Sequence, residues 1–508
     1  MIRICLILAR HDALFPFGPV YPGTQLLRYG RLLRRRRRPT SPRPGQRLAA
    51  AFEELGPSFI KLGQLLSTRA DLLGEELAGD LATLQDRLPP FPGAQARALI
   101  EAEFSRPLDV LFATFDETAI AAASIAQVHF ARTTDGQHVA VKVLRPGIAA
   151  AFARDLDLFL WLAGLGERLQ PALRRLKPVE VVQTLAEVVR FEMDLRLEAA
   201  AAAELAENFA GDSNFRIPRV DWARTGRSVL TTERINGIRI DDRGATLAAG
   251  HKIEDLLGKA ATAFFNQVFR DGFFHADLHP GNMFVDPDGA IVVVDFGIMG
   301  RLDRATRFYL ADMLLGFLAG DYRRVAEIHF AAGYVPTGRS IDAFTQACRS
   351  IGEPILGKPL QEISVARLLA QLFEITEQFE METQPQLLLL QKTMVVIEGV
   401  GRRLDPTINI WALAQPLIEE WMRDNRGPEA RLRQGMETLA DLAERLPRLV
   451  RSLEVLVTNW SRDGVILHAE SLAVQAAHRA RHLGIVLLPI WLTAAALVSI
   501  AVTLLLQR

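Results

Sequence analysis

Two short stretches, HADLHPGN at residues 275–282 and VVVDFG at residues 292–297, decide how this sequence is expected to fold. VVVDFG reads as a short buried strand that ends in a carboxylate and a glycine, and HADLHPGN as a loop that follows an amphipathic helix. Asp277, Asn282 and Asp295 would therefore converge from loop and strand ends. Asp295 and the Asn282 carbonyl are hard oxygen ligands of the kind that Mg²⁺ prefers, and Asp277 could accept a proton from, or orient, a hydroxyl or water.

A lysine and a glutamate extend this set of polar residues. Lys142 is the single cation in VAVKVL, residues 139–144, which reads as an apolar strand. A lysine in a buried strand must be paired because an unpaired buried charge is costly, although a lysine on an edge strand would face water. Glu198 follows in FEMDLRLE, residues 191–198, on a long helix expected over about 179–210.

In this order the motifs resemble the protein-kinase-like fold, which implies ATP and Mg²⁺ as ligands. The resemblance implies that Lys142 holds nucleotide phosphates and that Glu198 is its ion-pair partner. It makes Asp277 the catalytic carboxylate of an Asp-x-x-x-x-Asn loop, and Asn282 and Asp295 the metal ligands, with Asp295 opening an intact Asp-Phe-Gly.

The expected nucleotide-binding loop departs from that of ordinary protein kinases. No GxGxxG precedes Lys142, and alanine cannot visit positive φ as glycine does, so the loop should be stiffer. No Ala-Pro-Glu follows Asp295, so the segment that docks peptide substrates is unrecognisable. The residues expected to bind ATP here are Ile120, Ala121, Ala122, Ala123, Ser124, Ile125, Ala126, Gln127 and Val128. VLTTERING, residues 229–237, matches an adenine-binding strand and hinge with Thr232 and Glu233, although an ordinary strand and turn is about as good an interpretation.

Together with KLGQ at residues 61–64 and FEMD at residues 191–194, these departures resemble the UbiB family, the aarF-domain or ADCK-type atypical kinases. The resemblance covers about residues 50–400. It implies that the KLGQ helix covers the site where a peptide would bind. The residues expected to regulate the site are Lys61, Gln64, Glu192 and Asp194, with Glu192 or Asp194 pairing with Lys61.

A glycine, a leucine and two histidines within these motifs have alternative interpretations. Gly63 within the KLGQ helix costs about 1 kcal/mol relative to alanine, which suggests a close approach of another segment, with a merely tolerated glycine as the alternative. Leu278 stands where the family usually has proline. His275 and His279 flank a loop, so a zinc site is only a weak alternative.

The composition excludes several classes of protein. Lysine plus arginine and aspartate plus glutamate both number 59, and this neutral balance argues against a dedicated nucleic-acid binder. The two cysteines, Cys5 and Cys348, cannot form a disulfide framework or a CxxC zinc site.

Both ends of the chain suggest a membrane. Residues 1–50 hold eleven arginines and one acid, which favours anionic lipid, with a solvated tail as the alternative. Residues 484–506 contain no charge, and about 20 apolar residues span a bilayer, whereas a buried soluble helix seldom lacks polar residues all round. Arg479 and Arg481 before this segment favour a cytoplasmic large domain. The first ten residues lack a cleavage site, so we expect an uncleaved N-terminus.

We therefore expect an α+β, bilobal protein-kinase-like fold with an N-terminal helical extension and a C-terminal transmembrane helix. The expected parts are a basic segment 1–45, a helical KxGQ extension 46–110, an N-lobe 111–236, a helical C-lobe 237–460 and a membrane span 484–506. The resemblance implies an ATPase at the bacterial cytoplasmic membrane that supports ubiquinone (coenzyme Q) biosynthesis, with its catalytic domain on the cytoplasmic side. Its expected partners are a membrane lipid or isoprenoid phenol, other enzymes of ubiquinone biosynthesis and a second copy of the chain, but no nucleic acid. A small-molecule or lipid kinase and a pseudokinase scaffold are the alternatives, and a polyprenylphenol hydroxylase is less favoured.

Overall fold

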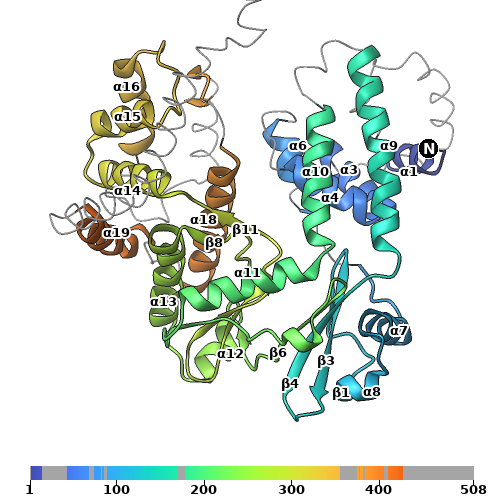
Figure 1. The fold of residues 1–508 in the computed structure, drawn as a ribbon. Helices are drawn as coiled ribbons and strands as arrows, with labels where there is room; N and C mark the ends of the chain where they lie inside the picture. Colours follow the sequence, from blue (N-terminus) through green and yellow to red (C-terminus); the bar gives the residue numbers. More distant parts are fainter. Residues whose placement is uncertain are drawn as a thin grey trace, which may run out of the picture. The chain divides into compact units, whose positions relative to one another are not determined.

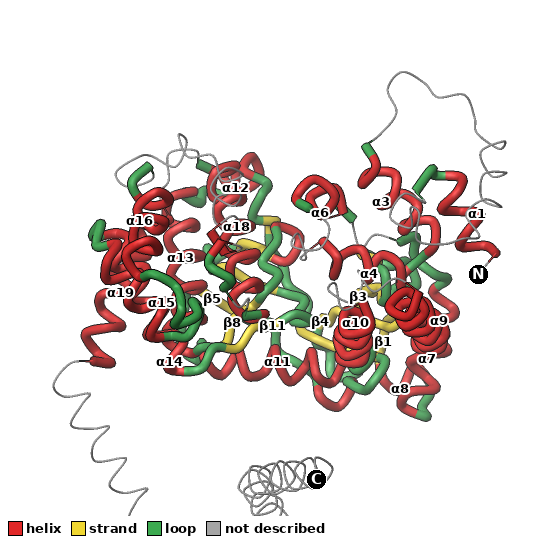
Figure 2. The backbone as a smooth tube through the Cα atoms, turned by 90° about the horizontal axis from the view of Figure 1, so that it is seen from above, coloured by secondary structure: helices red, strands yellow, loops and turns green. Residues whose placement is uncertain are grey.

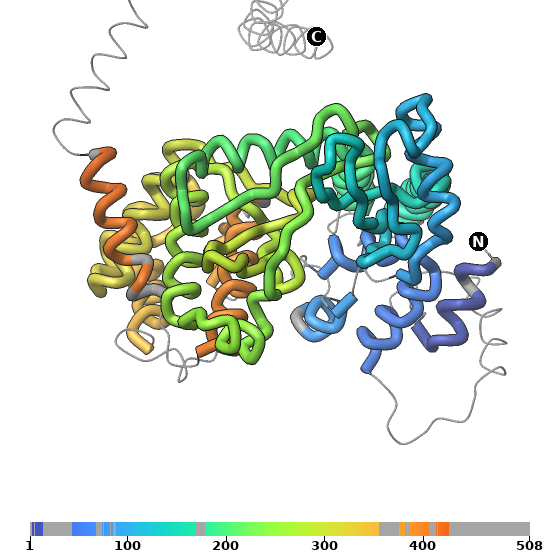
Figure 3. The backbone as a smooth tube through the Cα atoms, turned by 90° about the horizontal axis from the view of Figure 1, so that it is seen from below, coloured from blue at the N-terminus to red at the C-terminus, as the bar shows by residue number. Residues whose placement is uncertain are grey.

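The computed structural model describes most of the chain up to residue 426. The described residues are 2–13, 43–67, 74–81, 83–84, 88–169, 178–354, 375–376, 378–381, 384–405 and 410–426. The chain divides into two units, residues 1–423 and 424–508, and nearly all of the described residues belong to the first. In that unit, N-terminal helices, a five-stranded sheet and a largely helical C-terminal part follow one another along the chain (Figures 1 and 3).

The first four described helices share one core with two helices that come later in the chain. The six are α1 (Ile2–Arg10), α3 (Pro44–Leu55), α4 (Pro57–Ser67), α6 (Glu75–Leu81), α9 (Ile148–Leu169) and α10 (Pro178–Glu192). Phe59 of α4 lies between Phe52 of α3 and Phe159 of α9, with ring centroids 5.8 and 4.9 Å away. Ile7 and Leu8 of α1 are buried in the same core. The KLGQ helix, α4, is thereby fixed against α9 and α10 (Figure 2).

The sheet is antiparallel, with strand order β1-β3-β4-β6 and β2 paired to β3. Its elements and covering helices are α7 (Gly93–Phe104), α8 (Leu108–Leu111), β1 (Phe112–Phe115), β2 (Ala121–Ala122), β3 (Ala126–Thr133), β4 (His138–Leu144) and β6 (Val229–Glu233). Val139, Val141 and Val143 alternate along β4 and are buried in one core with apolar residues of α7 and α8. Because side chains alternate along a strand, Lys142 points to the opposite face.

The long helix expected over residues 179–210 is two helices, which corrects the sequence prediction. α10 ends at Glu192, and α11 runs over Leu195–Asn208. Asp194 between them is extended, with φ −129° and ψ 92°, and its side chain accepts a hydrogen bond from the backbone N–H of Arg196. An aspartate in this role satisfies an orphan donor of the helix start, and so favours a new helix over continuation of the old one. Glu198 consequently lies in the first turn of α11.

The C-terminal part contains two small sheets besides its helices. One has the order β5-β10-β9-β7, and the other pairs β11 with β8. The strands are β5 (Phe215–Arg216), β7 (Ile238–Arg239), β8 (Phe273–His275), β9 (Met283–Val285), β10 (Ile291–Val293) and β11 (Met299–Arg301). The α-helices are α12 (Arg243–Ala248), α13 (Ile253–Phe265), α14 (Arg304–Leu318), α15 (Tyr322–Ala331), α16 (Ile341–Gly352), α18 (Pro385–Leu404) and α19 (Ile410–Arg426). Short turns are the 3₁₀ segments η4 (Trp222–Arg224) and η6 (Pro280–Asn282) and the π-helical η5 (Asn266–Asp271).

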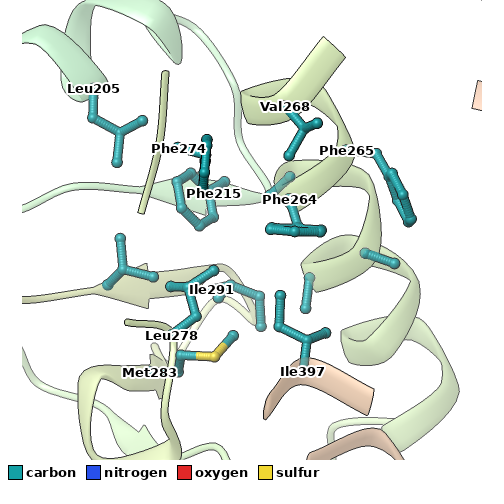
Figure 4. Packing of buried hydrophobic residues seen from close by; sticks show 14 of the residues in the cluster. Leu205, Phe215, Phe264, Phe265, Val268, Phe274, Leu278, Met283, Ile291 and Ile397 are labelled. Atoms are coloured by element: carbon teal, nitrogen blue, oxygen red, sulfur yellow. The ribbon is translucent and has the colours of Figure 1, made fainter. Parts of the chain in front are cut away.

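One hydrophobic core joins several of these elements and includes residues of the HADLHPGN and VVVDFG stretches (Figure 4). Phe264 of α13, Phe274 of β8 and Ile291 of β10 are buried in it. Leu278 of the HADLHPGN loop and Ile397 of α18 are buried in the same cluster. The loop is therefore anchored from both a strand and a helix more than one hundred residues further along the chain.

The segments expected to meet a membrane are largely outside the described residues. The uncharged stretch 484–506 and the arginine run 34–38 both lie there. Among the helices that are described, none is both long enough and apolar enough to cross a bilayer.

Candidate nucleotide-binding and phosphoryl-transfer site

Lys142 on β4 forms the centre of the candidate site. Its Nζ donates to both carboxylate oxygens of Glu198, at 2.7 Å and 2.9 Å, and to Oδ1 of Asp295 at 3.0 Å. Strand alternation turns Lys142 away from the valine face of β4, and the first turn of α11 presents Glu198 to it. The structure thus brings together three of the residues that the sequence analysis had selected.

Asp295 adopts an uncommon backbone conformation at the end of its strand. Its φ is +65°, in the left-handed region where residues other than glycine are rare. The next residue, Phe296, is buried and its ring centroid lies 5.6 Å from that of His275. Burial of Phe296 holds the turn, while the Asp295 side chain keeps 48 % exposure. The strained turn therefore presents the carboxylate to a ligand.

The charges of this network alter each other's pKa values. Burial by itself would lower the pKa of Lys142, but the carboxylates of Asp295 and Glu198 raise it. Burial raises the pKa of Glu198 to about 7, against the opposing effect of Lys142. Burial would also raise the pKa of Asp295, but Lys142 holds it well below its usual range. Asp295 is therefore the constantly charged carboxylate, as a metal ligand needs to be.

The HADLHPGN loop is held by the ring of His275. Its Nδ1 accepts a hydrogen bond from the backbone N–H of Asp277 at 3.1 Å, and its Nε2 lies 3.2 Å from the Val294 carbonyl oxygen. This pattern requires the neutral ring with hydrogen on Nε2, and burial correspondingly lowers the pKa of His275. Both ring nitrogens thus serve the loop, so the geometry does not favour the zinc alternative at His275.

Asn282 forms hydrogen bonds with Asp277 of its own loop and with Val294 after β10. Its side-chain Nδ2 donates to the backbone carbonyl of Asp277 at 3.1 Å. Its backbone carbonyl accepts a hydrogen bond from the backbone N–H of Val294 at 3.0 Å. The amide carbonyl oxygen of Asn282 and the carboxylate of Asp295 suit Mg²⁺, which is held by few protein ligands together with phosphates. Among the described residues no group of three histidines, cysteines or acids could hold a metal ion without such help.

The alanine-rich segment forms a tight antiparallel turn. Its strand pairs are Ala121 with Val128 and Ala122 with Gln127. The backbone N–H of Ala123 donates to the carbonyl of Ala126 at 2.8 Å. The non-glycine residues with positive φ all lie outside residues 121–128, as expected for alanine. Ile120 is exposed, whereas Ser124 and Ile125 are buried.

Gln127 lies in the expected nucleotide-binding segment, but its side chain faces away from Lys142. In the sheet register Gln127 lies opposite Val143, on the face away from Lys142. Its side-chain oxygen accepts from the backbone N–H of Phe91 at 2.9 Å, and its nitrogen donates to the Phe91 carbonyl at 3.1 Å. Gln127 therefore fastens the segment before α7 to the sheet.

Arg145 was not predicted, yet it connects the alanine-rich turn to the N-terminal extension. Its guanidinium donates twice to the Ala123 carbonyl, at 3.0 and 2.8 Å, and once to the Pro89 carbonyl at 3.0 Å. Its charged carbon also lies 5.7 Å from the centre of the Phe91 ring. An arginine three residues after Lys142 is the only sequence signal for this role, and it does not say which carbonyls the side chain reaches.

The KLGQ lysine pairs with one of its two expected partners. Lys61 Nζ lies 3.0 Å from Oε1 of Glu192, and their side chains are only 10 % and 6 % exposed. Lys61 also helps to lower the pKa of Asp295, and Glu192 helps to raise that of Glu198. The extension therefore adds a buried ion pair to the electrostatics of the Lys142 site.

Asp194, the other expected partner of Lys61, instead pairs with Arg196 at 2.6 Å as it caps α11. Gln64 donates to the Leu84 carbonyl at 3.5 Å, a long contact. A Cβ on Gly63 would lie 2.3 Å from Leu84 Cδ1 and 2.8 Å from Phe52 Cδ2, so any larger residue would force these side chains to shift. The close approach inferred from the sequence is confirmed.

Thr232 and Glu233, at the expected hinge, are the last two residues of β6. In the register Thr232 lies opposite Ala140, two positions from Lys142 on the same face of the sheet. The carboxylate of Glu233 lies 3.4 Å from Arg216 and 3.6 Å from Arg219. The sheet thus places Thr232 on the face of the candidate site, while the Glu233 side chain is engaged by arginines.

A lysine from a later helix, α18, also contacts the HADLHPGN loop. Lys392 on α18 places its Nζ 3.2 Å from Oδ1 of Asp277. The sequence analysis missed this residue because it is one lysine in a helical stretch, and helical periodicity does not reveal which distant loop a position faces.

The chain is similar to two known domain families and to a solved structure. Residues 83–329 match the ABC1 atypical kinase-like domain, and residues 348–409 match the UbiB helical domain. Lys142 and Asp277 fall in the first match and Lys392 in the second. A solved complex of Rv3197 with erythromycin from Mycobacterium tuberculosis is 28 % identical, covers 72 % of this chain and 93 % of that one, and has a TM-score of 0.49.

Several bacterial relatives carry the name probable protein kinase UbiB. The relative from Marinobacter nauticus is 46 % identical across 80 % of this chain and 75 % of its own. That from Azotobacter vinelandii is 43 % identical across 84 % and 79 %, and that from Aliivibrio fischeri 41 % identical across 92 % and 86 %. With these identities over most of its length, and with both domains matched in order, the chain belongs to the UbiB family of ABC1 atypical kinase-like proteins.

Proposed function

We propose that this protein binds ATP with Mg²⁺ and uses it, as an atypical kinase-like ATPase, to support ubiquinone biosynthesis at the bacterial cytoplasmic membrane. The observation that carries the proposal is the Lys142 network, in which one ammonium contacts Glu198 and Asp295 within 3.0 Å. Asp277 and Asn282 lie on the loop that follows β8, and the Asp277 side chain is partly exposed to a phosphate acceptor.

Each residue has a part in the proposed chemistry. Lys142, oriented by Glu198, would bind nucleotide phosphates, and Asn282 with Asp295 would hold the metal ion. When bound, Mg²⁺ would neutralise phosphate charge during transfer. Asp277 would orient the acceptor oxygen and receive its proton. These assignments remain proposals that mutagenesis can test one residue at a time.

The N-terminal extension favours water or a small molecule over a protein as phosphate acceptor. α4 brings the buried Lys61–Glu192 pair into electrostatic contact with the carboxylates of the Lys142 network. A protein kinase needs this side of its site open to a peptide chain. The alanine-rich turn, fastened by Arg145, further limits how the backbone can approach the phosphates.

The proposed place of action is the cytoplasmic side of the membrane. The basic N-terminal region and the uncharged stretch 484–506 would attach the protein to an anionic bilayer. The lipid-pathway partners that we propose are an isoprenoid phenol or membrane lipid, other enzymes of ubiquinone biosynthesis, and a second copy of this chain.

Phosphate release by the purified full-length protein tests the proposal. We expect Mg²⁺-dependent release that increases with anionic liposomes and an isoprenoid phenol. The matched variant Asp277→Asn should bind nucleotide but release little phosphate, because it loses the carboxylate that orients the acceptor. Binding of ATP without release by the wild-type protein would contradict the ATPase and support a nucleotide-binding scaffold. Absence of binding would contradict both.

A further inference from the structure

We propose that Lys392 binds the terminal phosphate of ATP beside Asp277, so that the helical domain at residues 348–409 supplies a cation to the phosphate site. The inference rests on the proposed ATP binding and adds a residue that distinguishes a nucleoside triphosphate from a diphosphate. It gives the helical domain a direct place in the site rather than a purely structural one.

The carboxylate of Asp277 has a lysine and a histidine in ion-pair range among the described residues. Lys392 Nζ lies 3.2 Å from its Oδ1, and His279 Nε2 lies 3.8 Å from its Oδ2. The loop HADLHPGN contains no lysine or arginine of its own. A permanent positive charge at this carboxylate therefore comes from α18.

The position of Lys392 relative to Asp277 is set by shared packing. Leu390 and Ile397 of α18 are buried in the same core as Leu278, the residue after Asp277 (Figure 4). α18 also packs against β11, which pairs with β8 just before the loop. Since one core holds both the helix and the loop, the 3.2 Å contact joins two anchored elements rather than two free side chains.

The pair can also be reached by a ligand. The Lys392 side chain is 44 % exposed and that of Asp277 28 % exposed, whereas Glu198 beside Lys142 is 9 % exposed. An ion pair that is open to water has little net stability, so its ammonium can exchange a carboxylate for a more highly charged phosphate. Lys142, by contrast, is already held in place because its ammonium donates to the carboxylates of Glu198 and Asp295.

The place of this cation points to the terminal phosphate. Asp277 would orient the acceptor oxygen, and that oxygen must lie about 3–3.5 Å from the phosphorus that it attacks. A cation in contact with Asp277 therefore adjoins the transferred group. Lys142 and Asp295 contact each other at 3.0 Å and not through Lys392, and they would hold the remaining phosphates and the metal.

Binding of ATP and of ADP, each with Mg²⁺, to the full-length protein provides the test. We compare wild type with Lys392→Met, which keeps the length and apolar stem of the side chain, and with Lys392→Arg, which keeps the charge. Arg403→Met is the matched control, because Arg403 is an exposed cation of the same helix that donates within it to Gly399 at 3.4 Å. The unfolding midpoint of each apo-protein checks that it is folded.

We expect Lys392→Met to weaken ATP binding about tenfold or more while changing ADP binding less than about twofold. Lys392→Arg should recover much of the ATP affinity, and Arg403→Met should resemble wild type. Unchanged ATP affinity in Lys392→Met, or an equal loss for ATP and ADP, would overturn the role of Lys392 and leave the proposed function standing. A wild-type protein that binds neither nucleotide would overturn both.

Discussion

At the scale of single residues, Asp295 combines a special backbone with a special charge. Replacing it by asparagine keeps a residue type that tolerates its φ of +65°, but removes the charge next to Lys142. We expect Asp295→Asn to abolish the stabilisation by Mg-ATP, because the metal loses its charged ligand. Thermal-shift titration measures this, with Asp241→Asn, at the surface pair with Arg239, as the control. Undiminished stabilisation of Asp295→Asn would remove Asp295 from the metal site.

His275 makes the catalytic loop sensitive to acid. Burial lowers its pKa from 6.5, although Asp295 and Asp277 oppose this and His279 adds to it. The unfolded chain therefore binds a proton more readily, so stability is lost as the pH falls below about 6.5, by at most about 1.4 kcal/mol per pH unit for this one residue. The urea midpoint of unfolding should fall as the pH is lowered from 7.5 to 5.5. His275→Gln should reduce this dependence of the midpoint on pH. An equal slope in both proteins would contradict this account.

At the scale of elements, α4 and the alanine-rich turn each restrain the site. Lys61→Ala breaks a buried pair with Glu192 and should cost about 3–5 kcal/mol, whereas Lys61→Met with Glu192→Gln should cost less. Ala123→Gly lets the turn visit positive φ and approach the phosphates. Equal unfolding free energies for the single and the paired replacement would contradict the part assigned to the ion pair.

Release of these restraints should also let the protein transfer phosphate from ATP to itself. We expect Lys61→Ala and Ala123→Gly to incorporate more radiolabel from ATP into the protein itself, yet to support growth on a respiratory carbon source less well than wild type. The restraint would thus direct the chemistry away from proteins. If both variants match wild type in both assays, the KLGQ helix and the turn are packing features only.

At the scale of the whole molecule, attachment to the membrane is proposed to rest on segments near the two ends of the sequence. Deleting residues 484–508 should release the protein to the soluble fraction at low salt, unless the basic N-terminal region holds it. Each arginine near an anionic surface contributes about 1 kcal/mol, and salt screens this attraction. Sedimentation with membranes, with and without the additional deletion of residues 14–42, separates the two contributions. A truncated protein that resists extraction in high salt would require a different anchor.

Local sequence patterns were enough to predict the residue types of the site and the strands that carry them. VAVKVL predicts a strand with a lysine that needs a partner, and VVVDFG predicts a strand that ends in a carboxylate, because alternation and glycine act over a few residues. Gly63 within a helix suggested a close approach of another segment, and the structure identifies Leu84 as the contact.

Only the tertiary structure decided which residues meet. Asp194 caps a helix rather than pairing with Lys61, because capping outweighs the general attraction of opposite charges. Strand register turns the Gln127 side chain away from Lys142. The contact of Lys392 with Asp277 spans 115 positions of the chain. Such contacts depend on how cores assemble from distant elements, and that information is absent from any local pattern of residues.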